Sequence, residues 1–148
     1  MKDRAFKKYS VFLLLFSFGM ILSGIPACKK ETQAVPNVSV NISLYAADPT
    51  FVPLNAVNGW LYVNGGNRGI LVFRKSLSEF IAFDRTCTNN PANVNEFVKV
   101  DASNINAACS NCGSTYSMFD GTKGTGPAPY PLKIYQNTFD GTVLHIFN

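Results

Sequence analysis

The sequence has little histidine and no clear helical periodicity. The first shortage limits the catalytic functions to consider, and the second limits the fold classes. Its 148 residues include one histidine, His145, so a hydrolase triad would depend on that residue alone, and no nucleophile motif accompanies it. No phosphate loop, calcium-binding loop or dinucleotide fingerprint occurs. No apolar periodicity of helical spacing is long enough for a helix, and no internal repeat is present. These absences argue against a stand-alone enzyme and against a helical fold.

Charge is also scarce once the N-terminus is set aside. Residues 1–27 contain four basic residues and one acid, so the rest of the chain has a formal charge of +1 against +4 for the whole. No basic patch remains that would bind nucleic acid. Nucleic acid is therefore excluded from the expected partners.

The N-terminus has the parts of a bacterial secretory signal. A basic segment, 1–9, precedes an apolar run, 11–25, that is too short for a comfortable membrane span. Ala27-Cys28 then resembles a lipobox, in which Cys28 becomes the acylated first residue of the mature protein. We therefore predict a signal peptide at 1–27 and a protein of the bacterial cell envelope, lipid-anchored to the membrane through Cys28, with its domain outside the cytoplasm. The alternatives are a plain signal peptide or an uncleaved anchor, with Cys28 an ordinary thiol.

The mature chain is predicted to be a lipidated tether, 28–36, followed by one domain, 37–148. Asn37–Leu44 alternates polar and apolar residues, which is typical of a half-buried strand. Asn64-Gly-Gly-Asn67 supplies the positive φ values of a tight hairpin. Further strands are expected at 60–63, 69–73, 80–83, 96–101, 132–135 and 143–147. Short strands with Gly, Asn and Pro between them predict an antiparallel all-β sandwich or barrel.

Three thiols remain if Cys28 is acylated, namely Cys87, Cys109 and Cys112. An odd number would leave a lone thiol after one disulfide has formed, whereas a bound metal would explain all three. Thiolates suit iron–sulfur clusters or zinc. Three thiolates and a weak fourth ligand could hold structural zinc. Alternatively the domain has no cofactor, and Cys109 pairs with Cys87 or with Cys112.

The cysteines belong to a longer pattern. Cys87-Thr-Asn89, Cys109-Ser-Asn-Cys112-Gly-Ser-Thr-Tyr116 and Gly126-Pro-Ala-Pro-Tyr-Pro131-Leu132 resemble the Rieske family, whose pattern is C-x-H, then C-x-x-H-G-S-x-[YF], then G-P-x-x-x-P-L. In that family two thiolates bind one iron of a [2Fe–2S] cluster and two imidazoles bind the other. The resemblance implies a Rieske-like all-β fold with a small cluster-binding subdomain at about 86–132.

Both imidazole positions differ from that pattern. The resemblance implies that Cys87 and Cys109 hold one iron and that Cys112 replaces the second imidazole. Asn89 stands at the first imidazole position, and its amide oxygen is a poor iron ligand. The fourth ligand would be Asn89 itself, water, or a residue of the same loop such as Asn90.

The surroundings of the implied cluster match the family better than the ligands do. Ser114 and Tyr116 stand where hydroxyls donate hydrogen bonds to a bridging sulfide and to a cysteine sulfur. Gly126, Pro127 and Pro131 match the loop that shields the cluster. A thiolate in place of an imidazole adds negative charge, so the potential should lie below the roughly −150 to +300 mV of His₂-ligated centres.

The sequence thus predicts a membrane-anchored electron-transfer module with an altered [2Fe–2S] site and a redox protein as partner. The alternatives are a structural or interaction lipoprotein that keeps a Rieske fold without a cofactor, or a structural zinc site.

Overall fold

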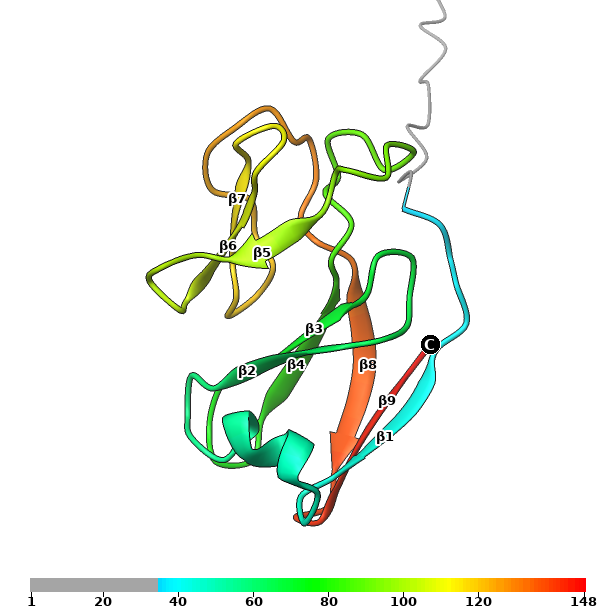
Figure 1. Ribbon diagram of the computed structural model, residues 1–148, viewed down its shortest axis with the longest axis vertical. Coiled ribbons are helices and arrows are strands. Elements are labelled where there is room, and N and C mark those ends of the chain that lie inside the picture. Colours follow the sequence, from blue (N-terminus) through cyan, green and yellow to red (C-terminus); the bar gives the residue numbers. More distant parts are fainter. Residues whose placement is uncertain (1–34) are drawn as a thin grey trace, which may run out of the picture. The chain divides into compact units, whose positions relative to one another are not determined.

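The computed structural model describes residues 35–148 and shows them built almost entirely from β-strands (Figure 1). The predicted signal peptide, the lipidation site Cys28 and most of the predicted tether lie outside the described residues. Within 35–148 the only helix is η1, a 3₁₀ helix at Pro49–Leu54. No helix in this part of the chain is long and apolar enough to cross a membrane.

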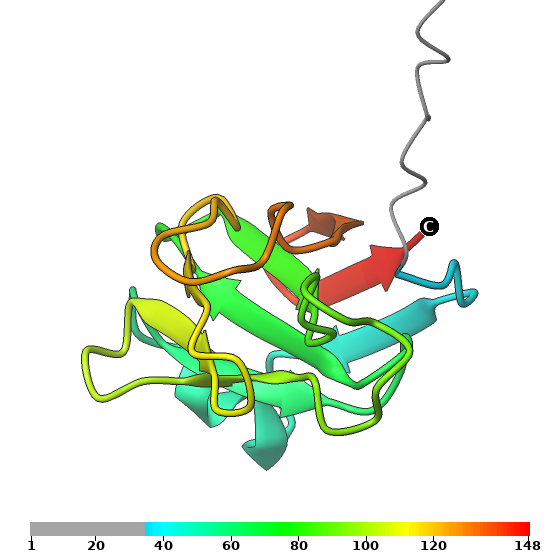
Figure 2. The same ribbon diagram turned by 90° about the horizontal axis from the view of Figure 1, so that it is seen from above.

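Six strands form a large antiparallel sheet that curls around its core (Figure 2). Their order across the sheet is β1 (Asn41–Tyr45), β9 (Val143–Phe147), β8 (Ile134–Phe139), β4 (Phe80–Asp84), β3 (Ile70–Arg74) and β2 (Trp60–Val63). Every pairing in it is antiparallel. The predicted antiparallel all-β class is therefore confirmed.

Three further strands form a small sheet inserted between β4 and β8. They are β5 (Val98–Val100), β6 (Asn106–Cys109) and β7 (Thr115–Ser117), again antiparallel. This small subdomain contains the second cysteine motif, and the first motif follows β4 directly. The small sheet thus lies where the resemblance places a cluster-binding subdomain, although the limits predicted for it, 86–132, stay a prediction.

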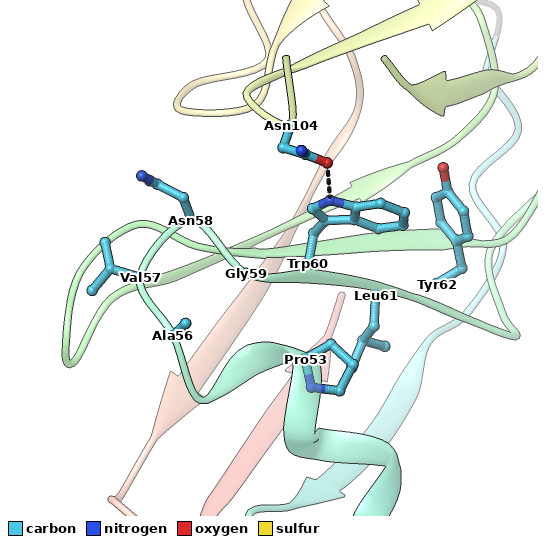
Figure 3. Close-up of a pocket in the computed structure, with 9 residues that line it drawn as sticks. All are labelled: Pro53, Ala56, Val57, Asn58, Gly59, Trp60, Leu61, Tyr62 and Asn104. Atoms are coloured by element: carbon cyan, nitrogen blue, oxygen red, sulfur yellow. Dashed lines mark hydrogen bonds between the residues drawn. The ribbon is translucent and has the colours of Figure 1, made fainter. Parts of the chain in front are cut away.

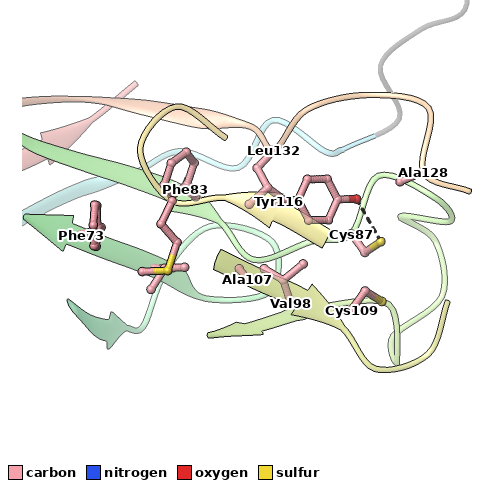
Figure 4. Close-up of a cluster of buried hydrophobic side chains, with 11 residues drawn as sticks. Phe73, Phe83, Cys87, Val98, Ala107, Cys109, Tyr116, Ala128 and Leu132 are labelled. Carbon is pink, nitrogen blue, oxygen red and sulfur yellow. Dashed lines mark hydrogen bonds between the residues drawn. The ribbon is translucent and has the colours of Figure 1, made fainter. Parts of the chain in front are cut away.

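Strand β3 is buried on both faces, as its unbroken apolar run requires. Ile70 and Val72 pack into one cluster with η1, β8 and β9, whereas Leu71 and Phe73 face the other way. The second cluster joins the large sheet to the small one (Figure 4). Its buried members are Leu71, Phe73, Phe83, Cys87, Val98, Ala107, Cys109, Tyr116, Met118, Ala128 and Leu132. Two of the cysteines are therefore part of a hydrophobic core.

A buried carboxylate fixes the start of the first cysteine loop. Asp84, at the end of β4, is fully buried and accepts hydrogen bonds from Thr86 N at 2.8 Å and Thr86 Oγ1 at 2.6 Å. Its other oxygen accepts from Asn67 N at 2.7 Å and from the Tyr135 hydroxyl at 2.7 Å. The β2–β3 turn passes so close that a Cβ at Gly66, where φ is +62°, would lie 2.6 Å from the carboxylate. Two features therefore favour glycine at this position of the predicted hairpin: the positive φ and the lack of room for a Cβ beside the carboxylate.

Candidate metal centre

Three cysteines and one glutamate converge at the loop end of the small sheet. Cys87 follows β4, Glu96 precedes β5, Cys109 ends β6 and Cys112 lies in the turn before β7. Their ligand atoms, three sulfurs and a carboxylate oxygen, all lie within 4.8 Å of one another. Three segments, the Cys87 loop, the residues just before β5 and the loop from Cys109 to Cys112, therefore present potential metal ligands to one point.

The second cysteine loop owes its shape to backbone hydrogen bonds and a glycine. Gly113 N donates to Cys109 O at 2.8 Å, and Cys109 N donates to Ser114 O at 2.8 Å, which closes the turn. Gly113 has a φ of +74°, a conformation that glycine adopts at little cost. This turn directs the sulfurs of Cys109 and Cys112 to the same side.

Strand register brings Glu96 to the site. Thr86 and Phe97 form an antiparallel bridge, and Cys87 N donates to Glu96 O at 2.9 Å, so Cys87 and Glu96 are opposite one another. Residues directly opposite in an antiparallel pair have their side chains on the same face. The carboxylate of Glu96 therefore lies on the side of the Cys87 sulfur.

The site is buried and held by short contacts. Cys87, Cys109 and Glu96 are each at most 2% exposed, whereas Cys112 is partly exposed. The sulfurs of Cys87 and Cys112 are 3.5 Å apart, and the Cys109 thiol donates to Glu96 Oε2 at 3.1 Å. These cysteines are free thiols rather than a disulfide. The close pair, Cys87 and Cys112, differs from both pairings considered for a protein without a cofactor.

The surroundings of the two buried thiols and of the carboxylate shift their pKa values in opposite directions. Burial raises the pKa of the Cys87 thiol well above its ordinary value. Burial, followed by the hydrogen bond to Glu96, also raises the pKa of Cys109. Burial alone would raise the pKa of Glu96, but hydrogen bonds from Cys109, Asn111 and Asn89 lower it more strongly, to about 2. A metal that binds here must displace thiol protons, since thiolates are the ligands.

Two hydroxyls predicted to surround the centre lie beside its sulfurs. The Tyr116 hydroxyl is 3.3 Å from the Cys87 sulfur (Figure 4), and the Cys112 thiol contacts Ser114 Oγ at 3.2 Å. Burial raises the pKa of Tyr116, so its phenol stays protonated at neutral pH. Ser114 Oγ also accepts from Ala128 N at 3.0 Å, which ties the third motif to the second.

The loop 126–131 contacts both cysteine loops. Gly126 has a φ of +96°, and a Cβ there would lie 2.5 Å from Ser114 Cα, so only glycine permits this approach. The hydroxyl of Thr88 donates to Tyr130 O at 2.6 Å and so connects this loop to the first cysteine loop. Pro127 and Pro131 are exposed on the outer side of the loop.

Asn89 lies beside the site, and Glu96 lies within it. Asn89 is exposed, and its amide nitrogen donates to Glu96 Oε1 at 3.2 Å. Sequence analysis assigned Glu96 only to a strand and missed it as a candidate ligand. The available signal was an acidic residue in the arm between two cysteine motifs, but the bridge that brings it to Cys87 could not be read from the sequence.

The donor set fits a metal ion in both type and size. A tetrahedral ion with bonds of about 2.3 Å holds its ligand atoms about 3.8 Å apart. The four ligand atoms here lie within 4.8 Å of one another, which includes that distance. Three thiolates and a carboxylate are ligands that both iron and zinc accept. A [2Fe–2S] cluster also takes four protein ligands, but two irons and two sulfides lie between its ligand pairs. The number and type of donors fit such a cluster, and the two cysteine loops would have to move apart to enclose it.

A hollow that none of the cysteines lines lies on the surface of the same unit (Figure 3). It is an open cavity of about 680 Å³ beside η1 and β2. Trp60 lies within it, and its indole nitrogen donates to Asn104 Oδ1 at 3.1 Å. The lining residues include no carboxylate, histidine or thiol, so this hollow offers none of the ligands found at the metal centre.

Comparisons with known proteins give weak likenesses. No protein-family model matches the chain, and no curated protein matches it significantly. Among solved structures it is similar to the ferredoxin of carbazole 1,9a-dioxygenase from Nocardioides aromaticivorans IC177, with 13% identity over 74% of this chain and 97% of that chain and a TM-score of 0.46. It is also similar to a chain in a complex of reduced oxygenase and oxidized ferredoxin in carbazole 1,9a-dioxygenase, with 22% identity over 59% of this chain and 79% of that chain and a TM-score of 0.43. Likenesses this low give no information on the site.

Proposed function

We propose that this chain is a membrane-anchored electron-transfer protein with an iron centre held in its small subdomain. One observation supports this above the others: three thiol sulfurs and a buried carboxylate oxygen lie within 4.8 Å of one another. Iron bound at this site supplies a one-electron couple. The iron form implied by the resemblance is a [2Fe–2S] cluster, with Cys87 and Cys109 on one iron and Cys112 on the other.

The surroundings of the sulfurs suit a redox centre. Tyr116 and Ser114 place hydroxyls beside two of the sulfurs, and hydrogen bonds to sulfur raise the potential of an iron centre. Three thiolates and a carboxylate place four negative charges around the metal, which favours its oxidised form. The potential should therefore lie below the roughly −150 to +300 mV range of His₂-ligated clusters.

The proposed partner is a second redox protein. Cys112 is partly exposed, whereas the other two cysteines are buried, so the centre comes nearest to solvent at this residue. A partner that docks over the Cys112 turn would come closest to the metal. The sequence of the domain has no basic patch and a low formal charge. We therefore expect the redox partner to bind through shape complementarity rather than through long-range electrostatic attraction.

The membrane anchor is proposed from the sequence of residues 1–28 alone. The basic segment, the short apolar run and Ala27-Cys28 support acylation of Cys28. Membrane fractionation of the full chain and its Cys28→Ser variant tests this point. The wild type should stay with the membrane after a high-salt wash and the variant should not, and equal distribution of the two would refute the anchor.

A structural zinc site is a second candidate, and one observation favours it. The ligand atoms all lie within 4.8 Å of one another, a range that includes the spacing around a single tetrahedral ion, and four protein ligands would leave no open position on it. Zinc has no redox chemistry, so the small subdomain would then be an interaction module whose loops the metal holds in place.

Metal analysis of the full chain, purified anaerobically, distinguishes these functions. Iron with charge-transfer bands that bleach on reduction supports electron transfer, and equal amounts of iron and labile sulfide identify a cluster. Zinc alone refutes electron transfer and supports the structural site. A folded, metal-free protein with a disulfide, seen by mass spectrometry without reductant, refutes both.

A further inference from the structure

We propose that Glu96 is the fourth protein ligand of the metal centre, so that the ligand set is three cysteines and one glutamate. This inference rests on the proposed metal-binding function and names the residue that completes the site. It assigns Asn89, which stands where the first imidazole is expected, to a supporting position.

Burial of the Glu96 carboxylate is the first argument. The residue is 2% exposed, and removing a carboxylate from water is costly unless a cation or a full set of hydrogen bonds compensates. Its partners among the described residues are neutral: the Cys109 thiol and the side-chain amides of Asn89 and Asn111. No Lys or Arg in the described part of the chain forms an ion pair with it. A metal cation bound between the carboxylate and the three thiols would supply the positive charge that this buried anion lacks.

The two oxygens of this carboxylate have different surroundings. Oε1 accepts from Asn89 Nδ2 at 3.2 Å and from Asn111 Nδ2 at 2.8 Å, so one amide from each cysteine loop holds it. Oε2 faces the sulfurs, 3.1 Å from Cys109 Sγ. The amides thus orient the carboxylate and leave Oε2 available to the metal. A metal held here would bind Oε2 together with the Cys109 thiolate, whose proton would pass to solvent.

Strand register explains why Glu96 has this role. On one side it lies opposite Cys87, through the bridge between Thr86 and Phe97. On the other side, β5 pairs with β6 with Val98 opposite Cys109, and continuing that register places Asn111 opposite Glu96. The hydrogen bond between these two side chains agrees with this placement. Glu96 therefore lies between the two cysteine loops.

The orientation of Asn89 is the remaining argument. Its amide nitrogen points at the Glu96 carboxylate, so Asn89 acts as a donor to a ligand. Hydrogen-bond donors behind a metal ligand fix its orientation, and their loss weakens metal binding less than loss of the ligand itself. Asn89 is thus a positioning residue.

Titration with Co²⁺ tests the assignment, because cobalt reports both affinity and ligand type. The full chain is purified in detergent, reduced, freed of metal and titrated anaerobically with Co²⁺ alone. We compare the wild type with Glu96→Gln, Glu96→Cys and Asn89→Ala, and with Glu79→Gln, which changes an exposed glutamate in the β3–β4 turn.

Glu96→Gln removes a ligand, so its affinity for Co²⁺ should be lower than that of the wild type by more than about tenfold. The ligand-field bands of the bound ion should also change. Glu96→Cys should restore tight binding and increase the thiolate-to-cobalt charge-transfer intensity, because a fourth sulfur joins the site. Asn89→Ala should weaken binding less than Glu96→Gln, and Glu79→Gln should match the wild type.

The outcomes separate this inference from the function on which it rests. A wild type that binds no Co²⁺ overturns both. A wild type that binds Co²⁺, together with a Glu96→Gln variant of equal affinity and unchanged bands, overturns only the role of Glu96. Should Glu96→Gln not fold, the charge-transfer intensity of Glu96→Cys decides: an increase supports ligation, and an unchanged intensity overturns it.

Discussion

Replacing Asp84 by asparagine should cost the protein about 2 to 4 kcal/mol of unfolding free energy. The buried carboxylate accepts two hydrogen bonds on each oxygen, from Thr86 on one and from Asn67 N and the Tyr135 hydroxyl on the other. An asparagine must place its NH₂ group at one of these positions, where it meets a backbone N–H. That buried donor loses its partner, at a cost of about 1 to 3 kcal/mol, and the other bonds lose the help of the charge.

The chain contains a matched control for this substitution. Asp120 accepts from Thr122 N at 3.0 Å and from Thr122 Oγ1 at 2.7 Å, the same local pattern as Asp84 with Thr86, but it is exposed. Asp120→Asn should change the unfolding free energy by no more than about 0.5 kcal/mol. Urea unfolding, followed through the single tryptophan with reductant and chelator present, measures both variants without a contribution from metal. Equal effects of Asp84→Asn and Asp120→Asn would refute the argument that burial makes this network stabilising.

Three further predictions concern the metal centre. Gly126→Ala should lower stability and metal affinity more than Gly141→Ala, because both glycines have a φ near +95° but only the first would place a Cβ against Ser114, and circular dichroism melts with metal titration compare them. Equal effects would mean that the loop approach is unimportant. A chelator should lower the thermal midpoint of the wild type and leave Cys112 the fastest of the three thiols to react with a thiol reagent, because it alone is partly exposed; an unchanged midpoint would argue against a bound metal. Tyr116→Phe should lower the potential of an iron centre, measured by spectroscopic titration, since it removes a hydroxyl beside the Cys87 sulfur; an unchanged potential would contradict this role.

Much of the fold could be predicted because its signals are local. The apolar run at 69–73 indicates β3, whose two faces both pack against other residues. Alternation predicts β1, and the Asn/Gly cluster predicts the β2–β3 turn, where positive φ values occur at Gly65 and Gly66. Each of these features depends on a few consecutive residues.

The candidate site was only partly predictable, because its assembly depends on long-range pairing. The cysteines could be singled out by their number and motif, although their role as ligands stays a prediction. Glu96 could not, since the bridge between Thr86 and Phe97 decides where its side chain lies, and a slip of one residue would direct it to the opposite face. The network around Asp84 was missed for a similar reason: Asn67 comes from the β2–β3 turn and Tyr135 from β8, and only the sheet topology brings them to Asp84.

The double burial of β3 has a consequence for the life of this protein in the cell. Leu71, Phe73 and Phe83 of the large sheet pack against the small sheet. A chain that lacked the small sheet would therefore expose a large hydrophobic surface on the larger one. The two sheets should therefore unfold in a single cooperative transition, without a populated intermediate in which only one sheet is folded. Evolution can therefore substitute residues in the loops around the thiols, but loss of the small sheet that carries them would destabilise the whole domain.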